Sequence, residues 1–497
     1  MKRRDFLKGT AGIGLGAGAM AALNAAGMMP VTRSAEADTM PTATTITPTA
    51  ETVMAAPLPH LPKSFLWGAS TSSYQIEGAV AEDGRQPSIW DVFAHQPGRI
   101  ADGATGDVAC DHYHRYAGDI DLLAQAGLQA YRFSIAWPRV MPTGRGEVNA
   151  KGLDFYDRLT DRLLEKGIQP WACLYHWDLP QALQAQGGWT NREIAGWFTD
   201  YALATVKRLG DRVKHWAMFN EPSVHAIFGH AIGNHAPGLT GWQNYVAAQH
   251  HQNLAQGMAL AALRETHRGL VLGTVFSLQP VHPATDRDID KAAAIRFDAV
   301  WNRANLDPLF KGQYPDVLAA SFAPLVKAGD LDTIHQKVDF LGVNYYGRAH
   351  VVDDPNSVLS GATFGPLPPG TPVTSMGWPV EPDGLVELLL DIKKNYHNPI
   401  TYVTENGAGY DDPAPQDGTV SDPQRAAFIQ MHAEAAAQAI AQGCALKGYF
   451  VWSLLDNFEW AEGMRRRFGV VHVDFQTQQR MPKLSYHLLA KLAQRQA

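Results

Sequence analysis

The amino-acid sequence predicts an α/β protein folded as a single (β/α)8 barrel, the TIM barrel, with its functional site at the carboxyl ends of the strands. Three observations lead to this prediction. Amphipathic helices alternate with short apolar strands, eight strands of this kind can be counted, and polar or aromatic clusters follow nearly all of them. Eight parallel strands joined by right-handed helical crossovers close into such a barrel. A doubly wound open sheet is the alternative, but it would gather its site at one switch point.

The repeating unit is clearest in three consecutive segments, where a helical pattern ends at a glycine and a strand follows at once. The glycines are Gly127, Gly167 and Gly210, and the strands expected after them cover residues 129–137, 168–177 and 213–220. Further strands are expected at residues 65–69, 270–276, 338–345, 400–404 and 448–452. Helix and strand alternating at this spacing indicate parallel pairing.

Composition and charge limit the classes of function. A chain of 497 residues with 45% apolar residues can bury a large core. Its net charge of -7 argues against general nucleic-acid binding, which needs a cationic surface. The three cysteines, Cys110, Cys173 and Cys444, show neither metal-ligand spacing nor a disulfide framework, so we expect them to be buried and free.

The N-terminal 59 residues differ from the rest of the chain. Paired arginines, Arg3 and Arg4, precede an uncharged Gly/Ala-rich run, so residues 1–37 resemble a twin-arginine export signal and predict a periplasmic or secreted protein. The run supplies little apolar area, which disfavours a stable membrane anchor. Residues 38–59 are rich in Thr, Ala and Pro and predict a flexible linker. The folded domain is expected to cover residues 60–497.

Two carboxylates stand out because each closes an apolar run. Glu221 lies in the segment 218–222, and Glu405 lies some 180 residues later in the segment 404–407. Two opposed carboxylates are the minimal equipment for cleaving a glycosidic bond, and a retaining enzyme holds them about 5–5.5 Å apart. Strand ends on opposite sides of a barrel can meet across such a gap. Pro222 disfavours a simple helical continuation at Glu221.

Six ordered motifs resemble glycoside hydrolase family 1, the β-glucosidases. They occupy residues 65–78, 131–139, 175–180, 219–222, 404–407 and 452–460. The resemblance covers roughly residues 60–490 and implies a retaining exo-β-glycosidase. It implies that Glu221 is the general acid/base and Glu405 the nucleophile. It also implies that Arg132 and the hydroxyl of Tyr346 hold Glu405 as an anion.

The resemblance further implies a pocket for the sugar that is cleaved off, the glycone. Its substrate-binding residues would be Gln75, His176, Trp177, Asn220, Trp452, Glu459, Trp460 and Phe468. Sugar hydroxyls need both donors and acceptors in fixed directions, and amide, imidazole, indole and carboxylate groups supply them. Small β-glucosides and cello-oligosaccharides are the expected substrates, and no cofactor is expected.

Two alternatives stay open. A 6-phospho-β-glycosidase is disfavoured because Glu459 would repel a phosphate at the sugar 6-position. The three arginines at residues 465–467 could bind a phosphate, so this alternative is kept. A non-catalytic sugar-binding protein would lack a carboxylate, and both are present.

No metal site is expected, because the histidines that lie near one another in sequence show no recognised ligand spacing; these are His112, His114, His230, His235, His250 and His251. Glucose, galactose and fucose are not distinguished, nor is the oligomeric state.

Overall fold

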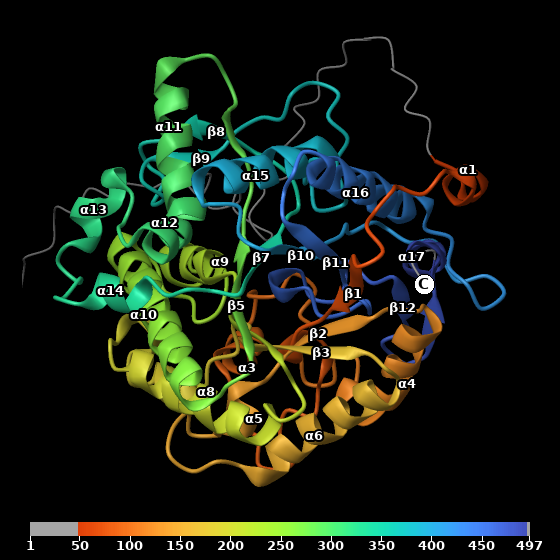
Figure 1. Cartoon of the computed structure of the whole chain (residues 1–497), viewed down its shortest axis with the longest axis horizontal. Helices are drawn as coiled ribbons and strands as arrows, with labels where there is room; N and C mark the ends of the chain where they lie inside the picture. Colours follow the sequence, from red (N-terminus) through yellow and green to blue (C-terminus); the bar gives the residue numbers. More distant parts are fainter. Residues whose placement is uncertain (1–47, 495–497) are drawn as a thin grey trace, which may run out of the picture.

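Eight parallel strands close into a barrel at the centre of the molecule (Figure 1). The computed structural model describes residues 48–494. In barrel order the strands are β1 (Leu66–Ser70), β11 (Leu446–Trp452), β10 (Thr401–Asn406), β7 (Phe340–Asn344), β5 (Val271–Ser277), β4 (His215–Asn220), β3 (Gln169–Tyr175) and β2 (Ala130–Ser134). Each overlaps a strand expected from the sequence, so the (β/α)8 prediction is confirmed.

A helix follows each barrel strand and covers the outside of the barrel (Figure 1). These helices are α4 (His112–Gln125), α6 (Ala150–Glu165), α8 (Ile194–Leu209), α10 (Trp242–Thr266), α12 (Ala304–Lys311), α15 (Pro382–Asn395), α16 (Pro423–Ala441) and α17 (Leu484–Gln494). Gly127 and Gly167 end α4 and α6 in the left-handed conformation, with φ of 70° and 71°. Gly210 differs, because its φ of -71° is ordinary helical backbone.

Shorter helices and strands lie in the segments between the barrel strands and their helices. The helical ones are α2 (Ser73–Ile76), α3 (Ile89–Ala94), α5 (Trp137–Val140), α7 (Gln181–Gln184), η1 (Gly188–Thr190), α9 (Pro222–Ala226), η2 (Ile227–Ile232), α11 (Asp288–Asp298), η3 (Ala299–Arg303), α13 (Asp316–Phe322), α14 (Asp330–Ile334) and η4 (Trp460–Glu462). Two small sheets are formed by β6 (Val281–Pro283), β8 (Ala349–Asp353) and β9 (Ala362–Phe364), and by β12 (Val471–Val473) and β13 (Arg480–Pro482). Trp137 begins α5 instead of ending β2 as expected, because Pro138 suits the first turn of a helix.

Aromatic rings fill the barrel interior. The ring of Trp171 lies 5.2 Å from the rings of both Phe340 and Phe450, between centroids. Glycines on neighbouring strands make room for these rings: a Cβ at Gly68 would lie 2.4 Å from Phe450, and one at Gly273 would lie 2.6 Å from Phe340. The interior is therefore a packed core that closes the barrel below the site.

The first and last barrel strands pair with each other. β1 and β11 run parallel, with Leu66 opposite Gly448 and Ser70 opposite Trp452. The barrel thus closes through segments that lie almost 400 residues apart in the sequence. All three cysteines are buried and free, as expected.

The segment expected to be a flexible linker contains a helix. Residues Ala50–Ala55 form α1, capped by Thr49, and Val53 on this helix is buried. Gln430 of α16 donates a hydrogen bond to the carbonyl of Pro57, and Lys491 of α17 donates one to the carbonyl of Met54. For residues 48–59 the linker expectation is therefore wrong, because Val53 and Leu58 bury enough apolar surface to dock the segment. The expected export signal, residues 1–37, lies outside the described residues.

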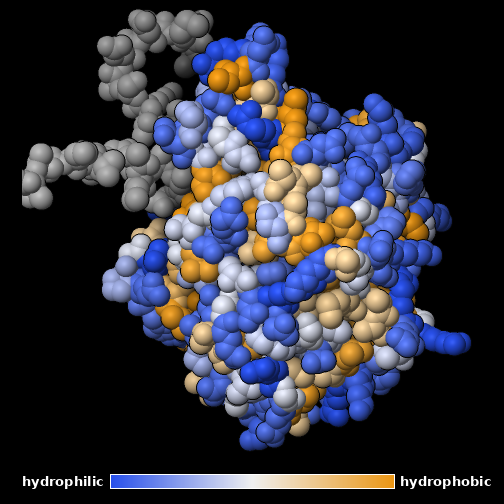
Figure 2. Space-filling model, turned by 90° about the vertical axis from the view of Figure 1, so that its left-hand side faces the viewer, coloured by the Kyte–Doolittle hydropathy of each residue, from blue (hydrophilic) through white to orange (hydrophobic). Residues whose placement is uncertain are grey.

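The face that carries α11, α13 and α14 mixes apolar and hydrophilic side chains (Figure 2). Exposed large apolar residues on these helices include Ile289, Ile295 and Val317, which stand apart among charged neighbours. Scattered apolar residues of this kind are normal for a protein surface. None of the helices between residues 48 and 494 has the length and apolar character needed to span a membrane.

Candidate active site

A pocket opens at the carboxyl ends of the barrel strands. Nine of the residues that line it are site residues expected from the sequence: His176, Trp177, Glu221, Tyr346, Glu405, Trp452, Glu459, Trp460 and Phe468. Three of these side chains are carboxylates and five are aromatic rings of Trp, Tyr or Phe. The pocket therefore offers acidic groups against flat apolar walls, as the chemistry of a sugar ring requires.

Glu221 is held in an unusual backbone conformation where β4 ends. Its φ of 48° lies in the left-handed region, and Pro222 then begins α9. The Glu221 amide donates a hydrogen bond to the carbonyl of Val275 on the neighbouring strand β5, at 2.9 Å. Trp177 and Trp460 also have positive φ, 78° and 45°. Residues other than glycine adopt this region only where the surroundings impose it, and here all three line the pocket.

Glu405, on β10, is fixed by two donors. Arg132 of β2 donates from Nη1 to Oε1 at 2.7 Å, and the hydroxyl of Tyr346 donates to Oε2 at 2.8 Å. Both carboxylate oxygens are therefore oriented from opposite sides. Gly407 follows closely, and a Cβ there would lie 1.7 Å from the carbonyl oxygen of Trp452. Only glycine lets the strand carrying Glu405 approach the strand carrying Trp452 this closely.

The two carboxyl groups have different electrostatic environments. Burial, and then the charge of Glu405, raise the pKa of Glu221 to about 8, although Asn344 donates a hydrogen bond to it at 2.9 Å. Burial also raises the pKa of Glu405, but the Arg132 guanidinium and the Tyr346 hydroxyl act in the opposite direction. The pair therefore carries its proton on Glu221 and its negative charge on Glu405.

A hydrogen-bond network fixes the tautomer of His176. The Asn220 side-chain oxygen accepts from Arg132 and from Asn344, at 2.6 and 3.0 Å, so its amide nitrogen must donate to Nε2 of His176, at 2.9 Å. The ring proton therefore lies on Nδ1, which has no partner among residues 48–494. Burial and the charge of Arg132 lower the pKa of His176 well below its usual value. His176 is thus a neutral donor free to bind a hydroxyl.

Glu459 faces the same pocket with a free oxygen. Its Oε2 is buried and has no hydrogen-bond partner in the part of the chain that the structure describes. Burial, followed by repulsion from Glu405, Glu462 and Glu221, raises its pKa well above the usual value. The three arginines at residues 465–467 bind other carboxylates. Arg465 and Arg466 bind Glu462, and Arg467 binds Asp456. No lysine or arginine is among the residues that line the pocket in the described chain.

Three of the expected site residues lie behind the lining. Arg132 and Asn220 act through the contacts given above. Gln75 is fully buried, and its Nε2 donates to Asn457 at 3.1 Å and to the carbonyl of Phe458 at 2.9 Å. Gln75 therefore holds the loop that leads to Glu459, and its role in substrate binding stays a prediction.

The family model for Glycosyl hydrolase family 1 matches residues 59–497 of the chain. The chain belongs to this family. The resemblance carried by the six motifs is thereby confirmed, and with it the assignment to an enzyme family.

Curated members of glycosyl hydrolase family 1 are similar over most of their length. Beta-glucosidase A of Thermotoga maritima is 46% identical over 427 residues, which cover 85% of this chain and 95% of the relative. A 1,4-beta-D-glucan glucohydrolase of Thermotoga neapolitana is 47% identical over 429 residues, 85% of this chain and 95% of the relative.

Solved structures of the family share the fold. A psychrophilic beta-glucosidase from Micrococcus antarcticus superposes with a TM-score of 0.85 at 46% identity, covering 88% of this chain and 98% of that one. Beta-glucosidase from Thermotoga maritima in complex with deoxynojirimycin has a TM-score of 0.84 at 43% identity, covering 88% of this chain and 100% of that one.

The structure adds pocket residues that the sequence analysis missed. They are Val224, Phe228, His235, Ser277, Leu278, Gln279, Trp301, Phe364 and Trp378. Ser277 ends β5 and Gln279 lies just beyond it, so the rule that polar residues follow barrel strands could have found them. Trp301 lies in η3 and Phe364 in β9, both in insertions whose path no local pattern reveals.

Proposed function

We propose that this chain is a retaining exo-β-glycosidase, specifically a β-glucosidase that releases terminal β-D-glucosyl residues. The observation that carries the proposal is the unequal pair in the pocket: Glu405 is bound by Arg132 and Tyr346, whereas Glu221 is bound by the amide of Asn344, and burial raises its pKa. A retaining mechanism needs one carboxylic acid and one carboxylate at the same bond. The enzyme family found for the chain agrees with this chemistry.

The reaction proceeds in two displacements. In the first, a Glu405 oxygen attacks the anomeric carbon while Glu221 gives its proton to the departing oxygen, which leaves a covalent glycosyl ester on Glu405. In the second, Glu221 removes a proton from water, the water oxygen bonds to the anomeric carbon, and the ester bond to Glu405 breaks. Arg132 and Tyr346 hold the nucleophile in place for both steps.

The substrate assignment rests on the relatives and on the pocket walls. The relatives are named as a beta-glucosidase and a glucan glucohydrolase. Trp301, Phe364 and Trp378 add apolar rings to the same pocket, and rings of this kind suit the faces of a second glucosyl unit or an aryl group. Short cello-oligosaccharides and aryl or alkyl β-glucosides are therefore the proposed substrates.

The stereochemistry of the first product tests the mechanism. NMR of a fresh hydrolysate of 4-nitrophenyl β-glucoside should show β-glucose before mutarotation produces the α-anomer. The appearance of α-glucose first would assign an inverting reaction and contradict the roles given to Glu221 and Glu405.

The 6-phospho-β-glycosidase alternative is disfavoured by the charges of the pocket. Glu459 would repel a phosphate, and the nearby arginines are engaged with Glu462 and Asp456. Comparing hydrolysis of 4-nitrophenyl β-glucoside with that of its 6-phosphate decides between them. Preference for the phosphorylated substrate would overturn the proposed substrate class.

Export through the twin-arginine pathway remains a proposal based on residues 1–37. Its support is the Arg3 and Arg4 pair ahead of an uncharged run. Replacing both arginines by lysine should retain the activity inside the producing cell, whereas the unaltered chain should release it to the periplasm or the medium. An unchanged distribution would contradict this route.

A further inference from the structure

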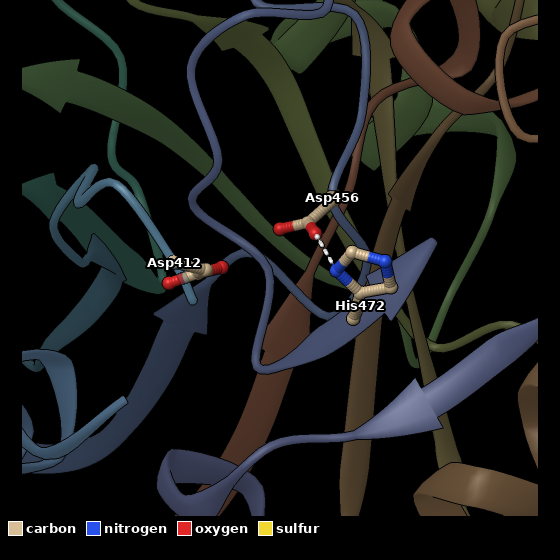
Figure 3. A group of neighbouring side chains, drawn as sticks. All are labelled: Asp412, Asp456 and His472. Atoms are coloured by element: carbon tan, nitrogen blue, oxygen red, sulfur yellow. Dashed lines mark ion pairs between the residues drawn. The ribbon is translucent and has the colours of Figure 1, made fainter. Parts of the chain in front are cut away.

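A buried group of charged side chains lies beside the pocket, between the loops that follow β10 and β11. Figure 3 shows three of its members, Asp412, Asp456 and His472, whose ligand atoms lie within 4.8 Å of one another. Such a group could suggest a metal site. The ammonium group of Lys483, however, binds the carboxylates of both Asp412 and Asp456, so the positive charge is supplied by the chain itself.

Asp456 is the centre of this group, and all of its oxygens are used. Oδ1 accepts from Lys483 Nζ at 2.7 Å and from the amide of Gly469 at 3.0 Å. Oδ2 accepts from Arg467 Nη1 at 2.7 Å. Asp456 and Lys483 are both fully buried, so these contacts are shielded from water and from salt.

The group joins the two loops that complete the pocket. Asp456 begins, and Arg467 and Gly469 end, the loop that carries Glu459, Trp460 and Phe468. Asp412 lies on the loop that follows the Glu405 strand, where Arg425 binds it at 2.8 Å. Arg425 also donates to the carbonyl of Ala408 on that loop, and to the carbonyl of Arg467 on the other.

Lys483 comes from a third segment. It follows β13 and directly precedes α17, and its amide donates to the carbonyl of Val470 at 3.0 Å. One ammonium group from the C-terminal segment therefore connects both pocket loops. Removing it leaves two buried carboxylates with one cation fewer and breaks the link between the loops, whether the carboxylates then move apart or take up a proton.

We propose that Lys483 is a positioning residue for glycone recognition: through Asp456 and Asp412 it sets the loop that carries Glu459 and Trp460 against the strand that carries Glu405. This inference rests on the proposed β-glucosidase function. Lys483 touches no substrate and acts only through the loops.

The test compares two substrates that differ at the sugar 6-position, which the resemblance to the family predicts to lie beside Glu459. A glucoside has a 6-hydroxymethyl group and a xyloside lacks it, so the ratio of their kcat/KM values reports how well the loop is placed. Lys483→Met should reduce this ratio about tenfold, mainly through a higher KM for 4-nitrophenyl β-glucoside. Lys483→Arg keeps the charge and should restore most of the ratio.

Two further variants separate positioning from a loss of stability. Asp330→Asn weakens an ion pair in which a buried carboxylate binds the partly exposed Arg192 at 2.9 Å, outside the pocket lining, and should lower Tm without changing the ratio. Arg467→Met acts on the same Asp456 from a partly exposed position, so it should fold even if Lys483→Met does not, and should reduce the ratio in the same direction.

The outcomes are distinct. If the unaltered chain hydrolyses neither substrate, the proposed function fails. The positioning role is overturned if the unaltered chain hydrolyses the glucoside and both Lys483→Met and Arg467→Met leave the ratio unchanged. If Lys483→Met does not fold, an unchanged ratio in Arg467→Met overturns it. A ratio that falls equally in Asp330→Asn would also overturn it, because the effect would then reflect general destabilisation.

Discussion

The guanidinium of Arg132 lies 2.7 Å from the carboxylate of Glu405, and both side chains are buried. A buried carboxylate without a partner would take up a proton. With Arg132 in place, Glu405 keeps its charge, and that charge in turn helps to keep the proton on Glu221. One ion pair thus distinguishes two residues of the same type.

This division of labour predicts different losses for two matched variants. Glu405→Gln should abolish turnover of every substrate, because no nucleophile remains. Glu221→Gln should reduce kcat/KM for alkyl glucosides by about 10²- to 10⁴-fold, the usual contribution of general acid catalysis, and spare the first step for leaving groups that need no proton. Steady-state kinetics with 2,4-dinitrophenyl and methyl β-glucosides measure both effects. Equal losses on the two substrates in Glu221→Gln would contradict its role as the acid.

The pH dependence should follow the proton on Glu221. Its pKa of about 8 means that the acid form is present below that pH and is lost as the pH rises through it. The kcat/KM profile should therefore fall on its basic side near pH 8. Glu221→Gln removes the titrating group, so the same profile measured with a 2,4-dinitrophenyl glucoside should lack this basic limb. Retention of the limb in that variant would assign it to another group.

Glu459 should reduce the stability of the fold. Burial and three neighbouring carboxylates raise its pKa, so the folded chain holds that proton more tightly than the unfolded chain does. The destabilisation is absent below the unfolded pKa of about 4.3 and grows as the pH rises above it. Glu459→Gln should therefore raise Tm at pH 7 by about 1–3 °C, and the gain should vanish near pH 4.

A neighbouring variant gives the opposite sign and serves as the control. Glu462 is buried as well, but it accepts hydrogen bonds from both Arg465 and Arg466. Glu462→Gln should lower Tm at pH 7, because two cations lose their partner. Thermal unfolding followed by circular dichroism at pH 4 and pH 7 measures both variants. A lower Tm for Glu459→Gln at pH 7 would refute the expected repulsion.

The helix α1 should stabilise the barrel without affecting the chemistry. Removing residues 1–57 deletes Val53 and the contacts with Gln430 and Lys491, which should lower Tm by about 1–3 °C. The kcat/KM for 4-nitrophenyl β-glucoside should not change, since α1 packs on α16 outside the pocket. Removing residues 1–47 keeps α1 and is the matched control. Equal Tm values for the two truncations would show that the docked helix contributes nothing.

Much of the barrel could be predicted because its signals are local. Apolar runs, the glycines at 127 and 167, and the polar residues at strand ends all lie within a few positions of the elements they specify. The helix α1 could not be predicted because six residues are too few for a stable isolated helix, so it depends on tertiary contacts between α1 and α16. The alternating pattern of residues 129–137 predicts a strand that includes Trp137, but Trp137 begins α5, where Pro138 occupies the first turn.

The site residues that local sequence signals predict also differ from those that depend on the tertiary fold. Glu221, Glu405, Trp177 and Trp452 reach the pocket because each lies at the end of a barrel strand or just beyond it, as the sequence pattern predicts. The docking of Gln75 on Asn457 and Phe458 could not be predicted, since it depends on how the loop after β11 folds back. Trp301 and Phe364 enter the pocket from insertions far from any motif. The tautomer of His176 is decided by hydrogen bonds from three other strands.

Pairing of β1 with β11 has a consequence for how the enzyme is made. Of the barrel strands, β1 leaves the ribosome first, and its partner strand, the Glu459 loop and Lys483 emerge only about 400 residues later. Neither barrel nor pocket can be complete before then. The nascent protein must therefore stay inactive until β11 and the loop that carries Glu459 have been made.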